Sequence, residues 1–360
     1  MSLWDSPSGE YFTSYEERMG LVRWRIEKIA LAIGLPLPFI YPVGVELGIF
    51  ATGQMMFISF IYIMAIAVIG LNIILGYAGE IVLAQGAFMA IGAWTATNLI
   101  NAGIGLIPAL LAGGLITAII SLVVGLPSFR VKGFYIAITT LALQFISEWF
   151  FSNSALEWLH GGTRHTLPGE IGLVGEFAVV TRGEPSFYYL SLVTLALVAL
   201  LSWNISRTGI GRSLKAVRDN DLAAEVLGIN VYLNKLLAFS LGGFVIGVAG
   251  GLYAFYLRSI DPEFFTLELT IEHYVMLIFG GLGHVWGAIT GAGIVTLLDE
   301  YFRHWIIDFA QAFGLSPSAT AVQPILFGFV IIAVLVIEPK GAMAVFAKVK
   351  EYLRNWPYAY

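Results

Sequence analysis

The sequence predicts an all-α fold: a polytopic integral membrane protein with about ten transmembrane helices, including two broken or re-entrant segments. Hydrophobic residues make up 58% of the 360 positions and charged residues only 12%, against about 25% charged residues in a soluble domain. The mean hydropathy is +0.83. Apolar runs such as Ile58–Ile69 do not alternate with polar residues, as a β-barrel would require. Because lipid offers no hydrogen-bond partners to the backbone, such spans are expected to be helical.

Apolar stretches of the length needed to cross the hydrocarbon core recur along the chain. We expect spans at 29–49, 54–75, 80–100, 105–126, 133–151, 187–206, 235–257, 270–284, 286–307 and 321–338. Residues 1–28 are predicted to form a cytoplasmic amphipathic segment at the interface, residues 29–338 the transmembrane domain, and residues 339–360 a cytoplasmic tail. The first apolar stretch is followed by prolines rather than a small-residue cleavage site, so we expect it to remain as an uncleaved span.

The basic residues predict the orientation of these spans. Lys and Arg cluster before the first span, between the fourth and fifth, between the sixth and seventh, and after the last. Ten crossings place all four clusters and both termini on one face, which the positive-inside rule identifies as cytoplasmic. The acidic loops at 152–186 and 258–269 are then extracytoplasmic. Trp94, Trp149 and Trp305 are predicted at outer span ends, where aromatic belts lie.

Two segments, one in each half of the chain, are interrupted by glycine: Gly70–Trp94 and Phe279–Gly293. Paired broken helices in corresponding halves indicate a transport pathway at mid-membrane, although glycine also simply permits close helix packing. We predict a translocation pathway or gate. Its predicted residues are Gly76, Gly79, Glu80, Gln85, Gly86, Gly280, Gly281 and Gly283.

Glu80 is the ionisable member of that set. A carboxylate in the membrane region is costly and therefore a functional candidate. The alternative is that Glu80, near the cytoplasmic end of its span, reaches water or a helix N-terminus.

The segment Ser206–Asn230 is too charged to cross the membrane and too regular for a random loop. Its apolar residues Leu214, Val217, Ala224 and Leu227 recur at a spacing of three to four, which predicts one apolar helical face.

A helix break is predicted within this segment, at residues 219–221. Asp219 is spaced to pair with Lys215, Asp221 is expected to cap a second short helix, and Gly228 to end it in the left-handed conformation. Adsorption on anionic lipid would explain the basic residues, but the small pair Ala223-Ala224 followed by Gly228 favours docking on a cytoplasmic partner. The predicted docking residues are Arg212, Lys215, Arg218, Asp219, Asp221, Ala223, Ala224 and Gly228.

This segment resembles the cytoplasmic coupling segment of bacterial ABC importer permeases, specifically the LivM-type branched-chain amino acid permeases. The importer motif reads Glu-Ala-Ala, three residues, Gly, and Ala223, Ala224 and Gly228 keep that spacing. Leu222 replaces the Glu, a departure that fits the LivM-type group. The similarity extends from about residue 54 to 342 and includes both glycine segments. In the outer loop, the residues after Gly161-Gly162 depart from the family pattern, which leaves room for another solute.

The resemblance implies a permease subunit of an ABC importer for branched-chain amino acids or a related small polar or organic solute. It implies as partners two cytoplasmic ATPase subunits, a second homologous permease subunit and an extracytoplasmic solute-binding protein, in the cytoplasmic (inner) membrane of a bacterium or archaeon. The sequence contains no G-x-x-x-x-G-K-[ST] motif, so ATP hydrolysis is expected on separate subunits and no enzyme activity on this chain.

No cofactor or metal site is expected, because the chain has no Cys and its five His residues share no metal-ligand spacing. Membrane lipid is an expected partner and nucleic acid is not. Two alternatives stay open: a secondary transporter driven by an ion gradient, which the broken helices and Glu80 would equally suit, and a sugar or urea permease of the same superfamily. A membrane anchor of a redox complex would require paired His ligands or a Cys cluster, and the sequence has neither.

Overall fold

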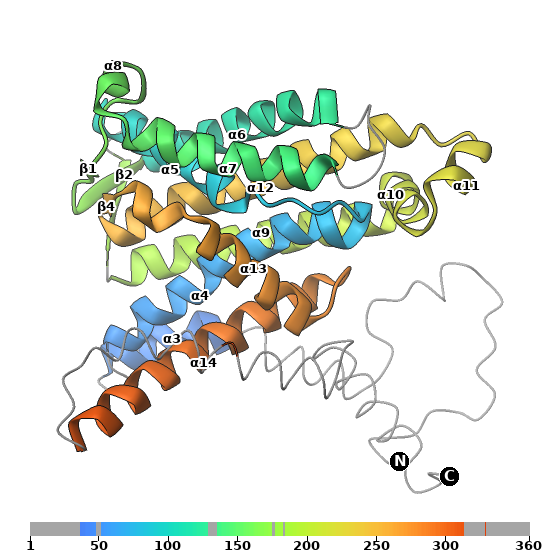
Figure 1. The fold of residues 1–360 in the computed structure, drawn as a ribbon. Coiled ribbons are helices and arrows are strands. Elements are labelled where there is room, and N and C mark those ends of the chain that lie inside the picture. Colours follow the sequence, from blue (N-terminus) through green and yellow to red (C-terminus); the bar gives the residue numbers. More distant parts are fainter. Residues whose placement is uncertain are drawn as a thin grey trace, which may run out of the picture.

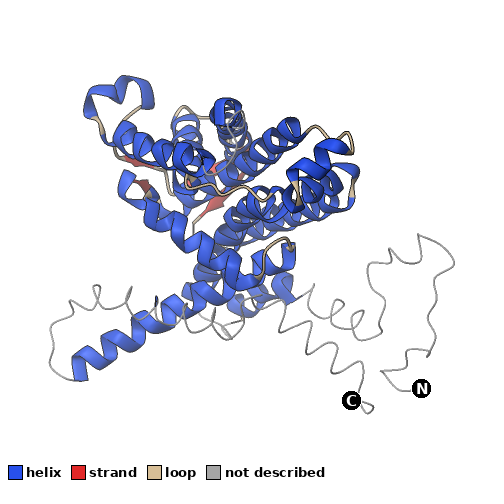
Figure 2. Ribbon diagram, turned by 45° about the vertical axis from the view of Figure 1, so that its right-hand side comes forward, coloured by secondary structure: helices blue, strands red, loops and turns tan. Residues whose placement is uncertain are grey.

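The computed structural model describes residues 37–47, 52–128, 135–174, 177–182, 184–312 and 328. Helices account for most of this part of the chain (Figure 2). Four of its helices are long and apolar enough to cross a membrane, or up to five if one bent helix pair counts as a single span. The predicted class, a helical membrane protein, agrees with this, whereas the count of about ten spans stays a prediction.

The elements follow one another as α3 (Leu37–Glu46), α4 (Thr52–Leu71), the π-helix η1 (Asn72–Tyr77), α5 (Gln85–Asn101), α6 (Leu106–Ser128), α7 (Tyr135–Ser152), η2 (Ser154–Leu156), α8 (Glu157–His160), β1 (His165–Thr166), β2 (Glu170–Val174), β3 (Phe177–Thr181), α9 (Pro185–Arg207), α10 (Gly209–Asp219), α11 (Asp221–Val226), α12 (Val231–Leu257), β4 (Ser259–Ile260), η3 (Pro262–Phe265), α13 (Leu267–Gly280) and α14 (Val285–Ala312). The strands form two short antiparallel pairs, β1–β4 and β2–β3.

The long helices lie side by side, with connecting segments gathered at both ends (Figure 1). Helix α8 and strands β1, β2 and β4 lie at one end, and α10 and α11 lie at the other. The loop at 152–186 and the segment at 206–230, predicted on opposite membrane faces, therefore lie at opposite ends of the bundle.

Most predicted spans in the described residues match a helix within a few residues, but the two glycine segments depart from a continuous helix. Helix α5 begins only at Gln85, so the first part of the predicted span 80–100 is non-helical. Helix α13 ends at Gly280, and the chain bends by 119° before α14. The N-terminal segment 1–28, Arg130, Lys132, the tail 339–360 and, except for Gly328, the predicted span 321–338 lie outside the described residues.

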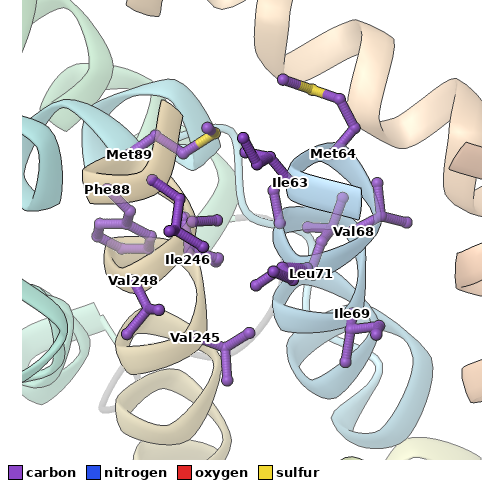
Figure 3. Packing of buried hydrophobic residues seen from close by; sticks show 14 of the residues in the cluster. Ile63, Met64, Val68, Ile69, Leu71, Phe88, Met89, Val245, Ile246 and Val248 are labelled. Atoms are coloured by element: carbon purple, nitrogen blue, oxygen red, sulfur yellow. The ribbon is translucent and has the colours of Figure 1, made fainter. Parts of the chain in front are cut away.

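The core lies between α4, α5 and α12. Figure 3 shows Ile63, Val68 and Leu71 of α4 beside Phe88 of α5 and Val245 of α12, and all five are buried. Helix–helix association in lipid gains little from the hydrophobic effect and depends on close contact, which small residues permit.

Trp94 is not an aromatic-belt residue, contrary to the prediction. Its side chain is buried, its Nε1 donates a hydrogen bond to the carbonyl of Gly162 (3.0 Å), and its ring stacks on Phe151 (centroids 4.2 Å apart). Because an indole N–H seeks a partner when buried, Trp94 instead attaches the outer loop to α5. Trp149 is exposed, as an interfacial residue would be.

Candidate functional site

Residues 79–84, between η1 and α5, form a non-helical stretch, called the extended segment below. Its first two N–H groups donate to backbone carbonyls of the preceding helix, and those of Val82 and Leu83 donate to side chains. The Val82 N–H donates to the Tyr274 hydroxyl (2.7 Å), which donates in turn to the Val82 carbonyl (2.9 Å). The N–H of Gly86, in the first turn of α5, donates to Oγ1 of Thr270 (2.9 Å). Both partners belong to α13, so α13 fastens the start of the broken helix.

Helix α7 fastens the same region from another side. The Leu83 N–H donates to Oγ1 of Thr140 (2.9 Å), and the Ala87 N–H donates to Oε1 of Gln144 (2.8 Å). Non-helical backbone at membrane depth is tolerated only where the protein supplies such partners. The sequence thus permits an unwound segment here because α7 and α13 carry hydroxyl and amide groups at the matching positions.

The two glycine-interrupted segments meet in space. The Gly283 N–H donates to Oδ1 of Asn72 (2.8 Å), and a Cβ at Gly76 would lie 2.7 Å from the Gly283 nitrogen. Gly281 and Gly283 have φ values of 108° and 80°, a region that favours glycine. The break in one half of the chain therefore packs on the break in the other.

The remaining predicted pathway residues lie elsewhere. Gln85 is buried at the start of α5, where its Nε2 donates to the Ala67 carbonyl (3.0 Å). Gly86 follows it, and Gly280 and Gly281 pack against Gly287 of α14. Of the eight predicted pathway residues, Gly79 and Glu80 line a cleft beside α11, which is described below.

Arg218 of α10 covers the junction of the two breaks. Its Nη1 donates to the Gly76 carbonyl (2.7 Å), its Cγ would lie 2.7 Å from a Cβ at Gly79, and its Nη1 would lie 3.1 Å from a Cβ at Gly283. Its guanidinium also pairs with Asp219 (3.0 Å). Three predicted pathway glycines and one predicted docking residue are thereby in contact.

The predicted apolar face of α10 is confirmed, because Leu214 and Val217 are fully buried. The predicted pair of Lys215 with Asp219 is wrong. Lys215 donates to the Ser206 carbonyl (3.3 Å) and lies 5.6 Å from the centre of the Tyr77 ring, a cation–π arrangement. Asp219 instead forms an ion pair with its neighbour Arg218.

Arg212 lies on the exposed side of α10, with its Nη1 3.5 Å from the Arg207 carbonyl. In the described part of the chain, its hydrogen bond is to α9 and not to either glycine-interrupted segment.

Helix α11 begins at the predicted break, but Asn220 caps it rather than Asp221. The Asn220 side chain accepts a hydrogen bond from the Ala223 N–H (3.0 Å). Asn220 has the extended conformation of a cap residue, while Asp221 is already helical. Gly228, with φ of 82°, follows α11 in the predicted left-handed conformation.

Helix α11 and the residue after it carry exposed apolar side chains. Leu222, Val226 and Leu227 are 63%, 89% and 78% exposed, whereas Ala224 is buried. Leu227, predicted on one apolar face with Leu214, Val217 and Ala224, instead lies past the end of α11 and is exposed, while the other three are buried. The exposed side chains of Leu222, Val226 and Leu227 are called the α11 apolar tip below.

The sequence reasoning missed the role of Lys235. Its Nζ lies 2.6 Å from a carboxylate oxygen of Glu80 and 2.6 Å from one of Asp221. Next to this group a cleft of about 800 Å³ separates residues 78–80 from α11. Lys235 is 155 positions from Glu80 in the sequence, so no local spacing signals the pair.

At the other end of the bundle the two acidic loops are joined. Arg164 forms an ion pair with Asp261, and β1 pairs with β4 so that His165 lies opposite Ile260. Burial, with a smaller contribution from nearby His160, lowers the pKa of His165 below its ordinary value. The two loops thus form one surface at this end of the bundle.

Among the described residues, His, Asp and Glu side chains do not gather in groups of three or more that could hold a metal ion.

Comparison with known proteins gives concordant results. A family model described as "Branched-chain amino acid transport system / permease component" matches residues 54–335. The high-affinity branched-chain amino acid transport system permease protein LivM of Salmonella typhimurium is 30% identical over 65% of this chain and 60% of its own length. The Escherichia coli protein of that name is 29% identical over 77% of this chain and 69% of its length.

More distant relatives carry other names. The autoinducer 2 import system permease protein LsrC of Escherichia coli is 28% identical over 45% of this chain and 54% of its own length. Among solved structures, PsaBC from Streptococcus pneumoniae in complex with Fab matches 82% of this chain and 95% of that chain, with a TM-score of 0.42 and 17% identity. That structural likeness is too distant to support a conclusion.

Proposed function

Since this chain belongs to the family of branched-chain amino acid transport system permease components, we propose that it is the membrane-spanning subunit of an ATP-driven importer. Its solute is a branched-chain amino acid. Two cytoplasmic ATPase subunits, a second homologous permease and an extracytoplasmic solute-binding protein complete the assembly, which lies in the cytoplasmic membrane with both termini of this chain inside.

The observation that supports this most directly is the α11 apolar tip. Leu222, Val226 and Leu227 are largely exposed on a segment too charged to cross the membrane. Contiguous exposed apolar side chains on a polar segment are typical of a protein–protein contact. The occupant we propose is the groove of an ATPase subunit.

Contacts of α10 with the two broken segments can transmit a movement of the ATPases to the membrane helices. Closure of the ATPases on ATP displaces α11 and α10, and Arg218 of α10 is hydrogen-bonded to the Gly76 carbonyl. Gly76 packs on Gly283, so the movement reaches both broken segments together. The solute is released inward because the ATP-bound and nucleotide-free states differ in affinity for it. The joined outer loops, linked by Arg164 and Asp261, receive the binding protein.

Reconstitution tests this function. This chain, the partner permease and two ATPase subunits of the same organism are placed in proteoliposomes with the binding protein and radiolabelled leucine. We expect uptake that requires ATP and stops with a non-hydrolysable analogue. Uptake by this chain alone, driven by an ion gradient without ATP, would instead identify a secondary transporter.

A related solute is the second candidate, because a permease for autoinducer 2 import is also among the relatives. Calorimetry on the cognate binding protein with leucine, isoleucine, valine, urea and simple sugars distinguishes these solutes.

Val226→Glu is expected to abolish association with the ATPases while leaving the membrane subunit folded. The side chain is 89% exposed, so a carboxylate costs little in the free subunit but is desolvated in an apolar groove. Co-purification of the ATPases with the permease is measured, with Trp158→Glu as the matched control: Trp158 is also largely exposed, at 80%, but lies on α8 at the other end of the bundle. Undiminished co-purification of the Val226→Glu variant would rule out the tip as the docking surface.

Gly228→Val is expected to reduce uptake about tenfold and leave the amount of membrane-inserted protein unchanged. No atom lies within 4 Å of the position where a Cβ would be, so the effect is backbone strain at φ of 82° alone. A left-handed conformation costs a non-glycine residue about 1–2 kcal/mol, and more for a β-branched one. Uptake and ATP hydrolysis are compared with those of Gly228→Asn, which tolerates this conformation. Equal uptake by the valine and asparagine variants would show that the conformation has no part in coupling.

A further inference from the structure

Lys235 bridges two carboxylates that come from different parts of the fold. Its Nζ lies 2.6 Å from Glu80 and 2.6 Å from Asp221. Glu80 belongs to the extended segment 79–84, Asp221 is the first residue of α11, and Lys235 lies near the start of α12. One ammonium group therefore connects the unwound part of the broken helix with the short helix that bears the α11 apolar tip.

The bridge spans open space. The cleft of about 800 Å³ is lined by Gly79 and Glu80 on one side and by Leu222, Glu225 and Gly228 on the other. Helix α11 is thus not packed against the extended segment along this cleft. Among the residues of this short helix, Ala224 is the buried one, and Lys235 connects the helix with Glu80 across the gap.

The two halves of the bridge differ in strength. The Glu80 and Lys235 side chains are 12% and 15% exposed, whereas the Asp221 side chain is 49% exposed. An exposed ion pair breaks at little cost because water replaces the partner, but separating a buried pair leaves an uncompensated charge. If α11 moves, the Asp221 contact is the one that opens, and Lys235 stays with Glu80.

We propose that Lys235 is a positioning residue that couples α11 to the extended segment 79–84: the closed Asp221 contact holds the segment in the state seen here, and its opening releases Lys235 and Glu80 as a unit. This rests on the proposed function and deepens it, since it names a second route beside Arg218 from the ATPase contact to the broken helix.

A set of variants tests whether Lys235 couples α11 to the segment 79–84 or only neutralises the charge of Glu80. Lys235→Gln removes the bridge and leaves the Glu80 carboxylate buried without its partner. Lys235→Gln combined with Glu80→Gln removes the bridge without leaving that charge. Lys235→Arg keeps it. Arg303→Gln is the matched control, because it removes another Arg/Lys–carboxylate contact, the exposed pair with Glu300 on α14.

Two quantities are measured on the complete complex: thermal stability in detergent, and leucine uptake per ATP hydrolysed in proteoliposomes. We expect Lys235→Gln to lower both, with uptake per ATP falling about tenfold, a typical coupling effect. The double variant regains stability but its uptake per ATP stays low. Lys235→Arg stays close to the wild type, as does Arg303→Gln.

Recovery of wild-type uptake per ATP in the double variant would overturn the proposal, because Lys235 would then only neutralise Glu80. Unchanged uptake per ATP in Lys235→Gln would overturn it as well. A wild-type complex without any ATP-driven uptake is a different result, since it refutes the importer function itself and the bridge's role with it.

Discussion

Gly92→Val is expected to eliminate folded protein from the membrane. A Cβ at Gly92 would collide with the backbone of Gly247 on α12, and a Cβ at Gly113 of α6 would lie 2.8 Å from the Gly92 carbonyl. Three helices thus meet backbone to backbone at one position. No side-chain rotation relieves a contact with main-chain atoms, so the helices must separate, at a cost of about 3 kcal/mol or more.

The measurement for this variant is the amount of monodisperse protein recovered in detergent, by size-exclusion chromatography. Gly53→Val is the matched control, because Gly53 is exposed and no atom lies within 4 Å of its Cβ position. We expect near-normal recovery of Gly53→Val and almost none of Gly92→Val. Normal recovery of both would contradict the close packing of α5, α6 and α12.

Arg218→Glu is expected to uncouple ATP hydrolysis from uptake, with uptake falling by about a hundredfold and membrane insertion intact. The guanidinium donates to the Gly76 carbonyl (2.7 Å), and a carboxylate there repels that oxygen as well as Asp219. Charge-assisted hydrogen bonds are among the stronger ones, so the loss is large. The α10 helix then no longer holds the junction of the two breaks.

Uptake and ATP hydrolysis of this variant are measured in parallel. ATP hydrolysis is expected to continue, because Arg218 lies behind the α11 apolar tip and not on it. Arg218→Lys keeps one positive donor and should retain intermediate uptake. Wild-type uptake by Arg218→Glu would remove the junction from the coupling route.

The helices and their breaks could be predicted from the sequence because they depend on residue types within each segment. Apolar runs of membrane length predict α6 and α9 closely, and the glycine content predicts that the chain unwinds before Gln85 and after Gly280. The left-handed conformation of Gly228 follows likewise from residue type and position.

Other errors have the opposite cause, since they depend on contacts between distant segments. Trp94 is of a residue type that is common in aromatic belts, but its indole N–H donates to the Gly162 carbonyl inside the fold. Asp221 contacts Lys235 of α12, and the cap of α11 is Asn220, one residue before it. The partner of Glu80 lies 155 positions away, and helical spacing carries no information about such a pair.

The extended segment 79–84 has a further consequence for how much change this region of the chain tolerates. In a helix, main-chain groups pair with one another, and most substitutions leave that pairing intact. Here the donors of Val82 and Leu83 depend on the hydroxyls of Tyr274 and Thr140. The loss of a single oxygen atom, from tyrosine to phenylalanine or from threonine to valine, therefore leaves a peptide N–H without its hydrogen-bond acceptor. At Tyr274 and Thr140, substitutions that barely change the shape of the side chain therefore remove a backbone hydrogen bond, as a proline does within a helix.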